Sequence, residues 1–143
     1  MKEILKSVKI VAPVDVVWNA LTKPDLMIPW MAEPEMAMEI VTTWNEGSTI
    51  VIRGFHHVKF ENKGIVVKFE PNTFLEYTYM SSLSRLPDNP ENYTHTSFRL
   101  TPLGNQTTLD LTLRNFPTEV IRKHIDFYWT STLTLLKQLI EKN

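Results

Sequence analysis

The first eleven residues alternate between apolar and polar side chains. Ile4, Val8 and Ile10 fall on one face of an extended segment over residues 3–11, and Lys6 shares that face. A period of two residues is typical of a β-strand with one buried face, so this segment is predicted to be a strand despite the lysine.

Six further segments of the same kind follow in the middle of the chain. They are rich in Thr, Val, Ile, Tyr and Phe, which favour strands, and short turn-rich links such as Asn45–Ser48 separate them. Such links are typical of antiparallel hairpins, so we expect a meander. The six predicted strands span residues 37–44, 49–58, 62–70, 73–82, 93–101 and 107–114.

The period then changes to that of a helix. Apolar residues recur at helical spacing over residues 118–142, and neither Gly nor Pro interrupts this stretch. Thr118 is a suitable N-cap residue directly after Pro117. The pattern predicts one long C-terminal helix with a broad apolar face. Pro13 likewise suits the first turn of an earlier helix.

One helix cannot cover the whole sheet. A helix is about 10–12 Å across, whereas six or seven strands spaced about 4.8 Å apart make a much wider surface. We therefore expect a curved sheet and a cavity where helix and sheet diverge. Buried tyrosine hydroxyls need partners, so Tyr77 and Tyr79 are expected at a polar or water-containing pocket. The residues expected to point inward are Leu75, Tyr77, Tyr79, Thr96, Phe98, Leu100, Leu109, Leu111 and Leu113.

The segment 24–38 contains four of the six methionines, at Met27, Met31, Met36 and Met38. Its prolines require any helix there to be short. Methionine adapts to differently shaped apolar partners, so the segment could form the lip of a pocket or a surface for a partner. The alternative is that the methionines fill gaps in the core.

Length, charge and composition narrow the function. With 143 residues the chain fits one domain, 1–143. Fifteen basic residues balance 16 acidic ones, which argues against nucleic acid as a partner. There is no cysteine, and no apolar run approaches the roughly 20 residues of a membrane span, so we expect a cytoplasmic protein without a membrane span.

Several strings resemble a known family. "IVAPVDVVWNALTKPDLMIPW" opens at residue 10, "GIVVKFEPNTFLEYTY" spans 64–79, "TSFRLTPLGNQTTLDLTL" spans 96–113 and "WTSTLTLLKQLIE" spans 129–141. In these strings, and at the Glu46-Gly47 turn, the chain is similar to the START-like helix-grip superfamily, the SRPBCC group. Within it, the chain resembles bacterial proteins similar to the C-terminal domain of the activator of Hsp90 ATPase.

The resemblance implies an α+β helix-grip fold. In this fold a curved antiparallel sheet of six to seven strands wraps around a long C-terminal helix, and two short helices follow the first strand. The chain departs from the family in a longer link at 81–95 and in "DFYW" at 126–129. The family has no shared catalytic motif, so the resemblance leaves activity open.

Candidate chemistry outside the pocket is sparse. The tandem His56-His57 near Glu61 is a weak metal site, because neighbouring strand residues point to opposite faces. Glu76 lies on the face opposite the inward set, which we expect to be exposed to solvent, as do Glu70 and Asp110. No nucleotide-binding or hydrolase motif occurs. We expect no cofactor, no metal and no catalytic residue.

The sequence therefore predicts a module that binds a small hydrophobic or lipid-like ligand between the sheet and the last helix. One alternative is a protein that binds an Hsp90-type chaperone through its surface. Another is a cyclase- or hydrolase-like enzyme that uses a pocket tyrosine as an acid, although an enzyme is the less favoured interpretation. The predicted ligand contacts are Trp30 at the pocket rim, Tyr77, Tyr79, Phe98, Trp129 and Leu133.

Overall fold

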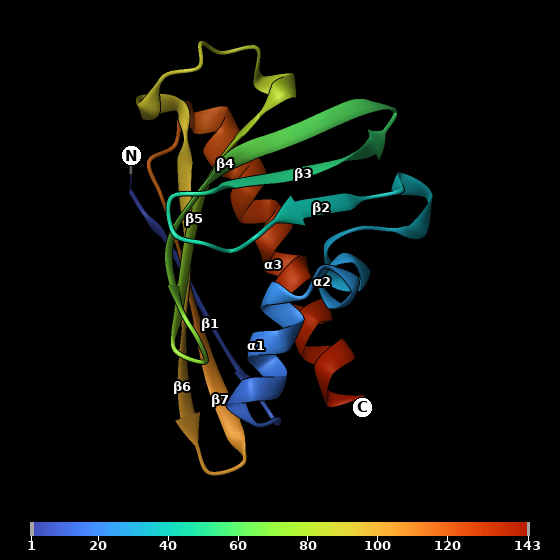
Figure 1. Cartoon of the computed structure of the whole chain (residues 1–143), viewed down its shortest axis with the longest axis vertical. Helices are drawn as coiled ribbons and strands as arrows, with labels where there is room; N and C mark the ends of the chain where they lie inside the picture. Colours follow the sequence, from blue (N-terminus) through green and yellow to red (C-terminus); the bar gives the residue numbers. More distant parts are fainter. Residues whose placement is uncertain (1, 143) are drawn as a thin grey trace.

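A computed structural model describes residues 2–142 and consists of one curved sheet and three helices (Figure 1). The strands are β1 Ile4–Ile10, β2 Glu39–Thr42, β3 Thr49–His56, β4 Val58–Glu70, β5 Phe74–Ser81, β6 Thr94–Leu103 and β7 Gln106–Arg114. The helices are α1 Val14–Thr22, α2 Pro24–Met31 and α3 Glu119–Glu141, and short 3₁₀ turns lie at Pro34–Met36, Ser82–Ser84 and Pro90–Asn92. This arrangement confirms the predicted α+β helix-grip fold.

All seven strands form one antiparallel sheet in the order β1-β7-β6-β5-β4-β3-β2. The meander from β2 to β7 therefore pairs each strand with the next, and β1 adds to β7 at one edge. In Figure 1, α3 runs along one face of the sheet, and α1 and α2 lie beside its C-terminal half. The sheet curves around α3, as the mismatch in width between helix and sheet requires.

The sheet bends at β4. Its register with β5 shifts between Val66 and Lys68. A Cβ atom added at Gly64 would lie 1.7 Å from the carbonyl oxygen of Thr78, so only glycine permits the close approach of β4 to β5. The predicted gap between strands at 59–61 is wrong, because β4 starts at Val58 directly after His57, whose φ is 66°.

Local sequence signals explain the helices. Lys23 precedes Pro24 and is extended, with φ −89° and ψ 119°, which separates α1 from α2. Thr118 caps α3, and its Oγ1 accepts a hydrogen bond from the Ile121 N–H at 3.1 Å. The expected N-cap is confirmed.

The inward face of the sheet follows the predicted alternation. Eight of the nine predicted inward positions are buried, and Tyr79 is half-buried. Lys6 also faces inward, where its Nζ lies 2.7 Å from Asp126 Oδ1 and donates to Thr130 Oγ1 at 3.1 Å. The lysine that interrupts the apolar face of β1 is thus explained by its partners on α3.

Candidate functional site

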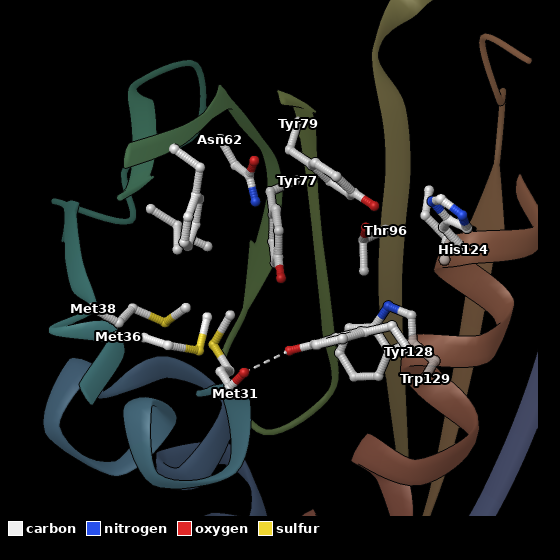
Figure 2. Close-up of a pocket in the computed structure, with 13 residues that line it drawn as sticks. Met31, Met36, Met38, Asn62, Tyr77, Tyr79, Thr96, His124, Tyr128 and Trp129 are labelled. Carbon is white, nitrogen blue, oxygen red and sulfur yellow. Dashed lines mark hydrogen bonds between the residues drawn. The ribbon is translucent and has the colours of Figure 1, made fainter. Parts of the chain in front are cut away.

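A cavity of about 270 Å³ lies between the N-terminal half of α3 and the inner face of the sheet (Figure 2). The end of α2 and the segment after it close one side. Its wall is mainly apolar, and most of its polar groups are hydroxyls. The lining residues are Met31, Met36, Met38, Ile52, Phe60, Asn62, Tyr77, Tyr79, Thr96, His124, Ile125, Tyr128 and Trp129.

Three methionines form the side of the cavity near α2. Met31 ends α2, and Met36 and Met38 flank Ala37, whose φ of 47° turns the chain toward β2. Figure 2 shows the three sulfur atoms gathered beside the cavity. Met27 is instead fully buried in the core. Met31, Met36 and Met38 thus line a pocket, whereas Met27 fills the core.

An aromatic cluster lies behind the cavity. Trp129 contacts Phe98 and Trp30, with ring centroids 5.7 Å and 5.9 Å apart. Trp30 is only 3% exposed, and its indole N–H donates to the Ala20 carbonyl at 2.9 Å. The expectation that Trp30 lies on the rim is wrong, because this hydrogen bond to α1 holds the ring in the core.

Three hydroxyl-bearing side chains meet on the cavity wall because of strand register. Tyr77 of β5 pairs directly with Thr96 of β6, and Tyr79 lies two residues further along the same face. Thr96 is 1% exposed, and its Oγ1 has no hydrogen-bond partner among the described residues. Within residues 2–142, the hydroxyls of Tyr77 and Tyr79 also lack a protein partner. Unpartnered buried hydroxyls are uncommon in folded proteins, and among the described residues only Thr96 Oγ1 is such a group. With the tyrosine hydroxyls, it adds polar groups to an otherwise apolar wall.

Burial changes the acidity of the cavity tyrosines. Loss of solvation raises the pKa of Tyr77 and of Tyr79 well above the usual value, and neighbouring tyrosines add to the effect. Burial also raises the pKa of Tyr128 to about 12. The tyrosines thus remain neutral near pH 7 and can act as both donors and acceptors.

Tyr128 spans the gap between α3 and α2. Its hydroxyl donates to the Met31 carbonyl at 3.0 Å, and its ring packs edge-on against Trp129 at 5.3 Å (Figure 2). The residue is 39% exposed, so one side of its ring faces solvent. This contact closes the cavity on the side of α2.

A second pocket of about 420 Å³ adjoins the cavity and extends toward the link at 82–93. Both are lined by Met36, Phe60, Asn62, Tyr79, His124 and Ile125. Neither is lined by Asp, Glu, Lys or Arg among the described residues. Together they offer a longer, uncharged space.

The structure brings together only half of the predicted ligand contacts. Tyr77, Tyr79 and Trp129 line the cavity, whereas Trp30, Phe98 and Leu133 are buried and are not among its lining residues. Sequence reasoning did not place Asn62, His124 and Tyr128 at the site. Asn62 lies on the same face of β4 as the buried Val66, and assignment of that face as the inner one would have identified it.

Other parts of the molecule offer less chemistry. No group of three or more His, Asp or Glu side chains in residues 2–142 is placed to hold a metal ion. Glu76 lies on the outer face as expected, but it is largely buried because His95 and Arg114 contact its carboxylate at 2.8 Å and 2.9 Å. None of the described helices combines the length and apolarity that a membrane span requires.

Comparisons with solved structures support the fold. A protein of Cytophaga hutchinsonii is 32% identical, with a TM-score of 0.82 over 99% of this chain and 95% of that one. The Aha1 dimer from Colwellia psychrerythraea is 26% identical, with a TM-score of 0.76 over 99% and 97%. CalU16 from Micromonospora echinospora, at 22% identity and a TM-score of 0.74 over 96% and 73%, shows the fold alone.

The sequence comparisons identify the family. No curated protein matches the chain. The family model described as "Activator of Hsp90 ATPase homolog 1-like protein" matches residues 11–141, which is nearly the whole chain. The resemblance found from the sequence strings is thus confirmed, and the chain belongs to the family of Activator of Hsp90 ATPase homolog 1-like proteins.

Proposed function

We propose that the protein binds a small, mainly apolar molecule in the cavity between the sheet and α3. The cavity has the features of a ligand site: it is concave and preformed, and its wall is apolar apart from a few convergent polar groups. With the adjoining pocket, the space suits an elongated molecule. Tyr77, Tyr79 and Trp129 are the proposed contacts from the wall. Trp30 and Phe98 pack against Trp129 from behind, and Leu133 is buried in the same core.

The observation that carries this proposal is the unpartnered hydroxyl of Thr96. A buried polar group without a hydrogen bond costs about 1–3 kcal/mol. Thr96 lies on the cavity wall with its Oγ1 unpaired among residues 2–142. An occupant that carries a polar group would remove this cost, whereas a dry, closed core would not.

Binding can be measured on protein stripped of lipids. Fatty acids, fatty alcohols, sterols and aromatic polyketide-like compounds would be added while tryptophan fluorescence and thermal unfolding are followed. We expect at least one class to raise the melting temperature and change the emission, because Trp129 lines the cavity.

A cavity-filling variant tests the location. Met36→Trp places a larger side chain in the shared wall and should abolish the thermal shift. Leu103→Trp is the matched control, since Leu103 is 70% exposed at the far turn between β6 and β7. No response to any class, together with a crystal structure whose cavity is closed by side chains, would exclude ligand binding.

The family match favours a second candidate, in which the protein binds an Hsp90-type chaperone and stimulates its ATPase. Met31, Met36 and Met38 line the cavity, so the link at 81–95, with the exposed Leu83, is the more available surface. A pull-down with the chaperone of the same organism, followed by an ATPase assay, separates this role from ligand binding alone.

The enzyme alternative has less support. A tyrosine acid must release its proton, and burial raises the pKa of Tyr77 and Tyr79, which makes them weaker acids. No carboxylate or lysine lines the cavity within the described chain. If turnover of a candidate substrate were found and were lost in Tyr77→Phe or Tyr79→Phe, this alternative would replace simple binding.

A further inference from the structure

We infer that the cavity selects an uncharged ligand with a hydroxyl or carbonyl group, and that it discriminates against fatty acids and other anions. This inference rests on the proposed function and makes it more specific. It follows from what the wall offers to the polar end of a ligand and from what it lacks.

The wall offers neutral hydrogen-bonding groups. Thr96, Tyr77 and Tyr79 come from neighbouring positions of the paired strands β5 and β6, and all three line the cavity. Figure 2 shows Thr96 between Tyr79 and Trp129, with Asn62 at the top of the cavity beside Tyr79. A hydroxyl both donates and accepts, so this group can bind an alcohol or a carbonyl oxygen.

The wall offers no permanent positive charge to an anion. None of the residues that line the cavity or the adjoining pocket is Lys or Arg. Three of the protein's cations contact groups outside the cavity: Lys63 contacts Asp88 at 2.8 Å, Lys6 contacts Asp126 at 2.7 Å, and Arg122 donates to the Lys2 carbonyl at 2.9 Å. The remaining ionisable groups besides the tyrosines are His124, which lines both spaces, and His56, which lines the outer one.

A carboxylate in this cavity would therefore lose its hydration without gaining an ion pair. Burial of an unpaired charge is much more costly than burial of a neutral polar group that is hydrogen-bonded. The raised pKa values of Tyr77 and Tyr79 have the same cause, because the site disfavours their anionic forms. What disfavours a phenolate on the wall also disfavours a carboxylate on a ligand.

The test compares 1-decanol with decanoate, which share one chain length and differ in the charge of the head group. Affinities would be measured by titration calorimetry on lipid-free protein at about pH 8, where imidazoles are ordinarily neutral. We expect decanol to bind at least about tenfold more tightly, which corresponds to about 1.4 kcal/mol. Equal or tighter binding of decanoate would overturn the inference while leaving the proposed function intact.

Thr96→Val removes the unpaired hydroxyl and keeps the shape of the side chain. It should weaken decanol binding about three- to tenfold and leave the free protein as stable as before or more stable, since the orphaned group is gone. Thr132→Val is the control, because the Thr132 hydroxyl donates to the Tyr128 carbonyl and does not line the cavity. Unchanged decanol affinity in Thr96→Val would contradict the role given to this hydroxyl.

Asn62→Lys tests the missing charge directly. Asn62 is half-buried at the junction of cavity and adjoining pocket, so a lysine there can reach both a ligand and water. Decanoate should gain about tenfold in affinity, whereas Asn62→Met should give no such gain. If decanoate gained nothing in Asn62→Lys, charge would not be the discriminating factor. If neither decanol, decanoate nor any probe of the broader set bound the wild-type protein, the proposed function itself would fail.

Discussion

The two halves of α3 meet the sheet in different ways. In the C-terminal half, Leu133, Leu136 and Ile140 are buried, and the Thr132 hydroxyl is hydrogen-bonded to the Tyr128 carbonyl at 2.6 Å. In the N-terminal half, the space between helix and sheet is a cavity, and the buried Thr96 hydroxyl on its wall lacks a protein partner within residues 2–142. One helix thus borders a filled core at one end and a preformed site at the other.

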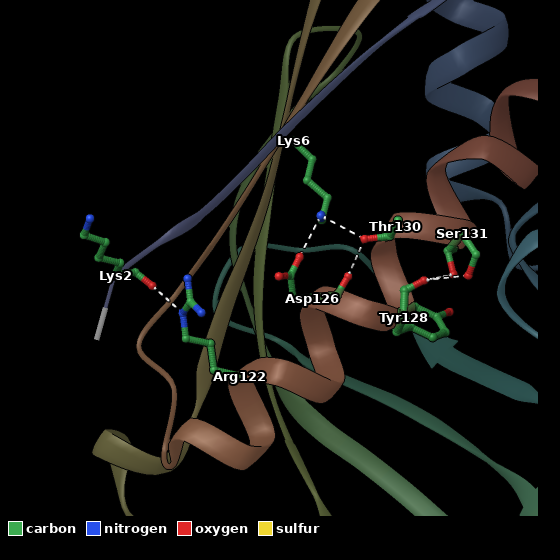
Figure 3. A network of polar contacts seen from close by, with 8 residues as sticks. Lys2, Lys6, Arg122, Asp126, Tyr128, Thr130 and Ser131 are labelled. Atoms are coloured by element: carbon green, nitrogen blue, oxygen red, sulfur yellow. Dashed lines mark hydrogen bonds and ion pairs between the residues drawn. The ribbon is translucent and has the colours of Figure 1, made fainter.

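Both halves of α3 make polar contacts with β1 and the residues that flank it, and we call this row of contacts the seam. Toward the N-terminal end, Arg122 donates to the Lys2 carbonyl and Lys6 contacts Asp126 (Figure 3). Toward the C-terminal end, Lys137 Nζ donates to the Lys9 carbonyl at 2.9 Å and the Val11 N–H donates to Glu141 at 2.8 Å. These contacts hold α3 against the edge of the sheet, including the half of the helix where the cavity replaces apolar packing.

The largest difference between the halves should appear in truncation of apolar side chains. Leu136→Ala empties a fully buried position and should lower the free energy of unfolding by about 3 kcal/mol. Met36→Ala enlarges an existing cavity at a half-buried position and should cost less than about 1 kcal/mol. Urea denaturation measures both values, and similar costs would mean that the two ends are packed equally well.

Alkaline pH should destabilise the cavity half specifically. An unfolded tyrosine ionises near pH 10, whereas Tyr77 and Tyr79 have raised pKa values in the folded state and keep their protons. The folded state then binds more protons, so stability is intact below pH 10 and falls above it, by up to about 1.4 kcal/mol per pH unit for each tyrosine. The double variant with Tyr77→Phe and Tyr79→Phe should flatten this slope in denaturation curves, and an unchanged slope would refute the assignment.

Removal of one seam contact at a time should affect the halves unequally. Lys6→Met keeps the aliphatic stem and loses the contact with Asp126, at side-chain exposures of 21% and 45%, so the expected cost is about 0.5–1 kcal/mol. This variant should also weaken ligand binding, because Asp126, the partner of Lys6 on α3, lies in the half of the helix that borders the cavity. Lys137→Met, the matched change in the packed half, should leave binding unchanged. Equal effects on calorimetric affinity would show that the halves are not independent.

The smallest effect is expected at the contact that closes the cavity. Tyr128→Phe removes the hydrogen bond to the Met31 carbonyl on a partly exposed ring, at a cost of about 0.5 kcal/mol. Ligand association and dissociation should both become faster in stopped-flow fluorescence, with little change in affinity. Unaltered rates would indicate that the ligand enters through the adjoining pocket instead.

The sequence predicts the inner face of the sheet well because strand alternation is a local rule. Once Leu75 and Tyr77 are assigned inward, the parity of β5 fixes Tyr79, and the same reasoning places Thr96 and Phe98. The long helix is equally clear, since its cap and its apolar period both lie within one continuous segment. The family strings add the overall arrangement.

The cavity lining is harder to predict because it depends on where elements far apart in sequence meet. Trp30 is withdrawn from the rim by a hydrogen bond to Ala20, and no spacing rule anticipates this contact. Tyr128 is held at the cavity by a hydrogen bond from its hydroxyl to the carbonyl of Met31, which lies 97 residues earlier in the chain. Asn62 lies inside the strand predicted at 62–70, but no inward face was assigned to that strand, because polar residues around Asn62 weaken its alternation.

The open sheet leaves two strands with an unpaired side, β1 and β2. Such edges can template pairing with further chains and lead to aggregation. Here β1 carries Lys6 and Lys9, and β2 has only four residues before Trp44 turns the backbone to a φ of 63°. Neither edge is a long, flat, apolar strand, so the same sheet that curves widely enough to hold a cavity is poorly suited to grow into fibres.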